Sequence, residues 1–218
     1  MWRLPVLMFV LLALASIPRL QGQVGRQTIE TCHQATKGDR VRGMALNAEA
    51  WALAAMGQYE AALVSLERAM ALWPDGVSQY MLGGHLRLNL DEYDGARADY
   101  ERVIAVEPSN AEARVGRADA LIHLGLPDPA IEELDRAIAL DDGEPLAFLL
   151  RGIALIDRWR AHFVREDIRR AIEDFDRAIA LDPNNGEAFY QRAWAHRRLD
   201  HDVEAARDFK RAYDLGIR

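Results

Sequence analysis

The chain has 218 residues, half of them apolar, and a formal net charge of −7 at neutral pH. A chain of this length and composition can bury a sizeable core, and one domain is expected. The acidity argues against nucleic acid as the main partner, because phosphate binding requires clustered lysine and arginine.

Residues 1–22 are predicted to be a secretory signal peptide. Arg3 supplies a positive charge, and residues 6–15 after it are wholly apolar. Even a helix over residues 4–17 would extend only about 21 Å, which is short of the ~30 Å hydrocarbon core of a bilayer. Cleavage is expected after Ala15 or after Gly22. The sequence therefore predicts an exported protein, periplasmic or secreted, with an uncleaved N-terminal anchor as the alternative.

Residues 23–42 are a polar lead-in with one expected short helix, residues 28–37, ending at Gly38. Cys32 in this segment is the only cysteine of the chain. An exported chain with one cysteine forms no internal disulfide. We expect a buried, inert thiol, and a reactive or intermolecular thiol is the alternative.

A 34-residue period divides the rest of the chain into five repeats: 43–76, 77–110, 111–144, 145–185 and 186–218. Each is expected to be a pair of helices, with small residues where the two helices cross closely. In the first helix these are Ala50, Gly84, Ala118, Gly152 and Ala193. Early in the second they are Ala62, Ala96, Ala130, Ala171 and Ala205, and larger residues follow at Leu66, Tyr100, Leu134, Phe175 and Phe209. Seven additional residues, 159–165, are expected to lengthen the first helix of the fourth repeat.

The period and these residues resemble the tetratricopeptide repeat family over residues 43–218. The resemblance implies an all-α fold, a right-handed superhelical solenoid of antiparallel helix pairs. It also implies a non-catalytic scaffold or adaptor for protein–protein interaction in the cell envelope. In this family the first helices line a concave groove that binds a peptide or a protein.

Carried over by register, the candidate groove residues are Trp51, Met81, His85, Asp119, Tyr190, Trp194 and Arg197. Such a groove suits an extended or helical apolar peptide, since desolvated aromatic residues contribute most of the affinity. Arg197 and Arg198 beside Trp194 form a cationic and aromatic patch that suits an acidic peptide, and a solvated helix face is the alternative. The alternative for each residue is packing between neighbouring first helices. One subset of the family grips a C-terminal carboxylate with a set of clamp residues. In this chain only Asn47 resembles one of them, and it occupies a lysine position, so that mode is not expected.

The sequence shows no convergent set of catalytic groups, and we expect no enzyme activity, no cofactor and no metal. It has no glycine-rich phosphate loop and no His-Glu-x-x-His motif. His196 and His201 are five residues apart across an expected helix end, a spacing too loose to predict a zinc site. Two alternatives to the adaptor are a carrier of a small apolar ligand or lipid in the groove and a structural homo-oligomer. Membrane contact is expected only through an uncleaved signal segment.

Charged residues at two repeat positions predict ion pairs across the boundaries between repeats. The expected pairs are Asp99 with Arg117, Glu133 with Arg151, and Asp174 with Arg192. Pairing within one repeat fails in the second repeat, where Gly83 would face Asp99. We expect the boundary-crossing pairs to fix the stacking register.

Overall fold

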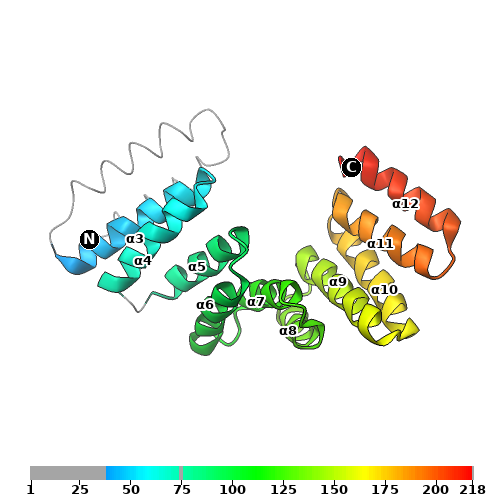
Figure 1. Cartoon of the computed structure of the whole chain (residues 1–218), viewed down its shortest axis with the longest axis horizontal. Helices are drawn as coiled ribbons and strands as arrows, with labels where there is room; N and C mark the ends of the chain where they lie inside the picture. Colours follow the sequence, from blue (N-terminus) through cyan, green and yellow to red (C-terminus); the bar gives the residue numbers. More distant parts are fainter. Residues whose placement is uncertain (1–37, 74–75, 218) are drawn as a thin grey trace. The chain divides into compact units, whose positions relative to one another are not determined.

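The computed structural model describes residues 38–73 and 76–217 (Figure 1). The predicted signal peptide, its cleavage sites, the lead-in helix and Cys32 lie outside the described residues. Within the described ranges all regular structure is α-helical. None of the helices in these ranges is long and apolar enough to span a bilayer.

The chain forms two compact units, residues 1–92 and 93–218, so the division falls inside the second predicted repeat. The described part of the first unit contains α3 (Asp39–Ala55), α4 (Tyr59–Leu72) and α5 (Val77–Asn89). α3 and α4 pack as a hairpin, and α5 packs against both. The small residues Ala50 and Ala62 are fully buried here, together with Leu66, as the repeat pattern predicts.

The second unit consists of helices α6 to α12, each packed against the next in the chain (Figure 1). Their bounds are α6 (Tyr93–Val106), α7 (Ala111–His123), α8 (Pro127–Leu140), α9 (Pro145–His162), α10 (Arg165–Leu181), α11 (Gly186–Arg198) and α12 (Asp202–Asp214). α9 also contacts α7 and α11. The first helices of repeats three, four and five therefore form one layer, with the second helices as the other layer.

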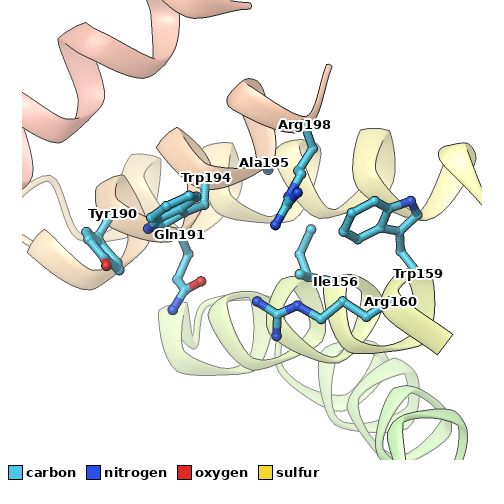
Figure 2. Close-up of a pocket in the computed structure, with 8 residues that line it drawn as sticks. All are labelled: Ile156, Trp159, Arg160, Tyr190, Gln191, Trp194, Ala195 and Arg198. Atoms are coloured by element: carbon cyan, nitrogen blue, oxygen red, sulfur yellow. The ribbon is translucent and has the colours of Figure 1, made fainter. Parts of the chain in front are cut away.

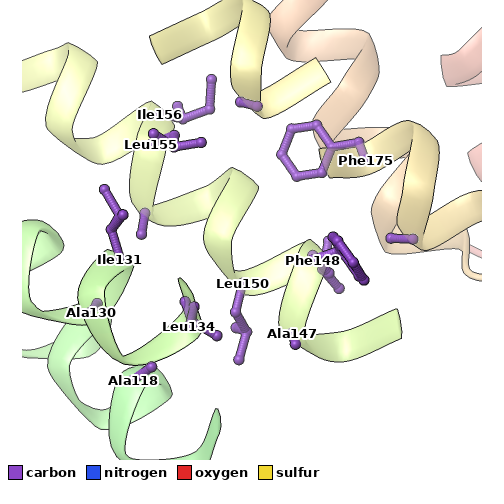
Figure 3. Close-up of a cluster of buried hydrophobic side chains, with 14 of the residues drawn as sticks. Ala118, Ala130, Ile131, Leu134, Ala147, Phe148, Leu150, Leu155, Ile156 and Phe175 are labelled. Atoms are coloured by element: carbon purple, nitrogen blue, oxygen red, sulfur yellow. The ribbon is translucent and has the colours of Figure 1, made fainter. Parts of the chain in front are cut away.

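The core of the second unit is built from the residues that the repeat pattern singled out (Figure 3). Ala118, Ala130 and Ala171 are fully buried, so neighbouring helices approach closely. Leu134 and Phe175 fill the space between the helices and are also fully buried. The expected all-α architecture of antiparallel helix pairs is confirmed.

Two helices of this unit, α7 and α11, begin after asparagines whose side chains cap a free backbone N–H group. The side chains of Asn110 and Asn185 each accept a 2.9 Å hydrogen bond from the backbone N–H three residues later. Each of these asparagines ends a loop that contains a proline. A proline and an N-capping asparagine thus separate the second repeat from the third and the fourth from the fifth.

The seven additional residues of the fourth repeat lengthen its first helix only in part: residues 159–162 extend α9, residues 163–164 lie between the helices, and Arg165 begins α10. α9 has 18 residues, whereas α7 and α11 have 13 each. Phe163, in the left-handed region with φ 58°, ends α9 and is 76% exposed. Trp159 packs against the core, and its ring makes an edge contact with Phe163 at 6.2 Å between centroids. The extra length therefore places Trp159 beyond the end of an ordinary repeat helix.

The predicted partners of the repeat arginines were wrong in two cases. Arg151 donates to Asp174 of its own repeat, at 2.9 Å from Nε and 2.6 Å from Nη2. Arg192 likewise makes two 2.7 Å hydrogen bonds to Asp208 of its own repeat. Each arginine faces the second helix of its own hairpin, which packs more closely than a neighbouring repeat. In the third repeat Arg117 lies 3.7 Å from Glu133, again within the repeat.

Contacts across repeat boundaries do occur, but they use a different carboxylate. The remaining amino group of Arg151 donates to Asp135 of the preceding repeat at 2.7 Å. That of Arg192 donates to Asp176 of the preceding repeat at 2.6 Å. One guanidinium therefore joins a buried carboxylate of its own hairpin to an exposed one of the neighbouring hairpin. This geometry ties adjacent repeats together through the fork of donors that only arginine offers.

Candidate functional site

A cleft of about 320 Å³ lies between α9 and α11, the first helices of the fourth and fifth repeats. Ile156, Trp159 and Arg160 line it from α9. Tyr190, Gln191, Trp194, Ala195 and Arg198 line it from α11. Figure 2 shows Arg160 and Arg198 extending from opposite helices into the space between them. The cleft thus combines an apolar and aromatic lining with cationic groups.

The aromatic wall on α11 is supported from behind by Phe209 of α12. The ring of Phe209 lies 5.8 Å from that of Tyr190 and 5.5 Å from that of Trp194, both in edge contacts. Tyr190 and Trp194 are themselves 6.3 Å apart. Such edge-to-face contacts restrict ring orientation and add to the energy of burial. Trp194 is held in place although it is 40% exposed.

The position of Phe209 on α12 depends on Ala193 of the neighbouring helix α11. In the fourth repeat the fully buried Phe175 ring lies directly over Gly152, and a Cβ at that position would be 2.8 Å from its Cζ. The fifth repeat has Ala193 at this position. A phenyl ring cannot occupy the same place against an alanine, and Phe209 is only half-buried and packs under Trp194 instead. The larger residue on α11 therefore shapes the aromatic wall of the cleft.

Two arginines are held over the tryptophan rings of the cleft. The guanidinium carbon of Arg197 lies 5.4 Å from the centroid of Trp194, and that of Arg198 lies 5.2 Å from the centroid of Trp159. Both distances fit cation–π contacts. Within the described ranges neither arginine has a carboxylate at ion-pair distance. Arg160, by contrast, donates to Asp157 one turn earlier at 2.6 Å.

Of the predicted groove residues, the structure brings Tyr190, Trp194 and Arg197 together. Asp119 lies on α7 and contacts His123 one turn away at 3.5 Å. Burial raises the pKa of Asp119, and the charge of His123 offsets part of that rise. Val115 and Leu149, which occupy the same repeat position as Met81 and Tyr190, are buried in the core. For these two residues packing between helices is the correct interpretation.

The other predicted groove residues belong to the first unit. Trp51 on α3 is 41% exposed, and Met81 and His85 on α5 are half-buried. Their assignment to a binding groove stays a prediction, as does that of the residues in the second unit.

The contribution of α9 to the cleft was not predicted. Trp159 and Arg160 belong to the additional residues of the fourth repeat, where the register of the repeats offers no guide. The sequence feature that could have predicted this contribution is the spacing of Trp159 from the small residue Gly152. Trp159 follows it by seven residues, or two helical turns, which places both on one face of α9. Among the described residues no cluster of three or more His, Cys, Asp or Glu side chains is placed to hold a metal ion.

The chain matches the family described as "Tetratricopeptide repeat" over residues 81–145 and 156–217. Among characterised proteins, the chain is 30% identical over 186 residues to "DnaJ homolog subfamily C member 3" of Mus musculus. It is 38% identical over 69 residues to "Hsp70-Hsp90 organizing protein" of Triticum aestivum. The matches cover 78% and 32% of this chain, but only 36% and 12% of those two proteins.

Among solved structures the fold is similar to that of MamA from Desulfovibrio magneticus RS-1. The TM-score is 0.68 at 20% identity, over 79% of this chain and 94% of the other. It is also similar to YrrB, described as "a TPR protein with an unusual peptide-binding site". There the TM-score is 0.60 at 20% identity, over 80% of this chain and 86% of the other. At this identity the likeness shows the fold alone.

Proposed function

Because this chain belongs to the tetratricopeptide repeat family, we propose that it is a non-catalytic interaction scaffold whose α9–α11 cleft binds an acidic peptide segment of a partner protein. Interaction scaffolding is the general role of the family, and the acidic peptide and its site are specific to this proposal. The observation that carries it is the placement of Arg197 and Arg198 over Trp194 and Trp159.

An arginine stacked on an indole ring is held in position but keeps its hydrogen-bond donors available. The planar face of the guanidinium contacts the indole ring, and its five N–H groups point outward in the plane of the guanidinium. A carboxylate can accept two of these hydrogen bonds in a fork geometry. The apolar side chains beside it, such as Ile156 and Trp194, can bury a neighbouring apolar side chain of the same peptide.

The charge of the rest of the chain makes such a cleft selective. With a net charge of −7, most of the surface repels an acidic peptide and attracts a basic one. An acidic peptide is therefore attracted to a site where two neighbouring arginines, Arg197 and Arg198, have no carboxylate at ion-pair distance within the described ranges. Specificity of this kind arises from repulsion elsewhere as well as from attraction at the site.

The experiment selects peptides from a phage-displayed random library on the full chain. The proposal expects enrichment of peptides in which Asp or Glu lies next to Leu, Phe or Trp. Each selected peptide is then compared with a version in which Asn and Gln replace Asp and Glu. We expect the neutral version to bind at least about tenfold more weakly, since one charge-assisted hydrogen bond contributes roughly 1.5–3 kcal/mol.

The matched variants separate the site from general charge. R197Q/R198Q removes the positive charge of Arg198, which lines the cleft, and that of Arg197, which lies over Trp194. R170Q/R207Q removes two positive charges from exposed positions of α10 and α12. Only the first pair is expected to weaken binding and to reduce its dependence on salt. Enrichment of basic peptides, or equal losses in both double variants, would contradict the proposal. A co-purifying lipid or small apolar molecule displaced from the cleft would favour the carrier function instead.

We also propose that the protein is exported, and the apolar segment after Arg3 supports this. The test is cell fractionation of the expressed chain, followed by N-terminal sequencing. A mature protein that begins at Ser16 or Gln23 is the expected result. A chain that keeps Met1 and stays in the membrane fraction would favour an uncleaved anchor.

A further inference from the structure

The turn between α11 and α12 brings two histidine rings together, and this pair takes no part in the proposed cleft. His196 lies in the last turn of α11, and His201 is the residue immediately before α12. Their Nδ1 atoms are 3.3 Å apart. The backbone N–H of His201 donates to the carbonyl of His196 at 3.0 Å, and Asp200 between them is in the left-handed region with φ 61°. The turn is therefore closed by the backbone, which brings the two ring centroids to 5.6 Å from each other.

We propose that His196 and His201 form a two-histidine site for a divalent zinc ion, bound through both Nδ1 atoms. Zinc–nitrogen bonds are about 2.0–2.1 Å long, and zinc prefers tetrahedral coordination. Two nitrogen ligands of a tetrahedral ion are then separated by about 3.3–3.4 Å. The observed 3.3 Å fits that separation. The right-angle arrangement of a square-planar Cu²⁺ site needs only about 2.9 Å, so the geometry favours zinc.

The surroundings of the pair favour a cation. The groups that act electrostatically on His196 are His201, the carboxylates of Asp208 and Glu204, and one guanidinium, that of Arg192. Arg192 is engaged by Asp208 and by Asp176 of α10, so its charge is balanced locally. The C-terminal end of α11 adds a partial negative charge. Asp202 and Glu204 in the first turn of α12 counter the positive end of that helix.

The site supplies two protein ligands, because the described residues hold no third metal ligand grouped with this pair. Water completes the coordination, as it does at open zinc sites. Each Nδ1 must be free of its proton to bind zinc, so the ring whose Nδ1–H donates to the other in the metal-free state would carry that proton on Nε2 in the zinc-bound state. The bound ion would join the end of α11 to the start of α12 and stabilise the last hairpin.

The test titrates ZnCl₂ into the full chain and follows the ¹⁵N resonances of the histidine rings. The titration is made in a C32S/H33Q background, because Cys32 and His33 are adjacent in sequence and can bind zinc themselves. We expect one zinc ion per chain, with shifts at the two rings of the pair. We also expect zinc to raise the melting temperature by a few degrees, since it binds the folded state.

Three variants decide the result. H196A and H201N are each expected to weaken zinc binding at least about tenfold, because even the loss of an outer-shell partner costs 10–100-fold. Asparagine is chosen at position 201 since it is a favourable residue before a helix, so the hairpin remains folded. H162Q, which changes an exposed histidine at the end of α9, is expected to bind zinc normally. Unchanged zinc affinity in H196A and H201N, or shifts at other histidines, would overturn the proposal.

Discussion

Replacement of Gly152 by alanine tests the close approach of α9 and α10 and is expected to destabilise the fold. A Cβ at residue 152 would lie 2.8 Å from Cζ and 2.9 Å from Cδ1 of Phe175, and nearer still to Cε1. The Phe175 ring is fully buried and belongs to the core of the second unit (Figure 3), so it cannot turn aside into solvent. Overpacking of this kind costs about 1–3 kcal/mol. Alanine gains about 1 kcal/mol over glycine inside a helix. The expected net loss in the free energy of unfolding is therefore between about 0 and 2 kcal/mol.

The control for this prediction is the same substitution in a chain where leucine replaces the phenyl ring of Phe175. The first and third repeats combine an alanine at this position with a leucine opposite, as in Ala118 and Leu134. In an F175L background the clash is removed, so G152A should stabilise the chain by up to about 1 kcal/mol through helix propensity alone.

The assay is a double-mutant cycle on thermal and urea unfolding, followed by circular dichroism. At this chain length 1 kcal/mol corresponds to about 2–4 °C in the melting temperature. The change of sign between the two backgrounds is the decisive feature, because it does not depend on the absolute stability of either chain. An effect of G152A that is the same in both backgrounds would show that Phe175 does not lie against Gly152.

Two further predictions concern the charged groups. R151A is expected to cost about 3–5 kcal/mol, since it leaves the carboxylate of Asp174, only 8% exposed, without its partner in the core. D135N, which removes the 49% exposed partner of the same arginine, should cost at most about 1 kcal/mol. Equal losses of unfolding free energy for R151A and D135N in urea would refute this difference between the two carboxylates. Asp119 gives a pH dependence. Burial raises the pKa of Asp119 above its ordinary value of about 4. Between that ordinary value and the raised one, the folded chain binds more protons than the unfolded chain, so its stability falls as the pH rises. D119N should therefore unfold at a higher urea concentration than the wild type at pH 7, and the difference should shrink toward pH 4. A lower midpoint for D119N at pH 7 would contradict this.

The sequence predicted the helix pairs because the close crossing of helices requires small residues at fixed intervals. Ala62, Ala130 and Ala171 are fully buried where the period placed them. The partners of Arg151 and Arg192 could not be predicted in the same way. Each side chain reaches two second helices at once, and the spacing of residues does not tell which helix offers the nearer carboxylate.

The α9–α11 cleft was predicted on one side only. Tyr190, Trp194 and Arg197 follow from repeat register, whereas Trp159 lies in residues that no other repeat contains. Its position depends on how far α9 continues before Phe163 ends it.

The histidine pair escaped prediction for a different reason. Five residues of separation do not indicate proximity, and it is the left-handed Asp200 that turns His201 back toward His196.

The central claim is that an acidic peptide binds between α9 and α11 (Figure 2). It is tested most directly by titrating an acidic library-selected peptide into ¹⁵N-labelled chain and following the indole N–H resonances. The proposal predicts shifts of Trp159 and Trp194, since both rings line the cleft, with no shift of Trp51 in the first unit. The neutral version of the peptide should leave all three resonances in place. A shift of Trp51 with Trp159 and Trp194 unchanged would contradict the proposal and place the binding site in the first unit.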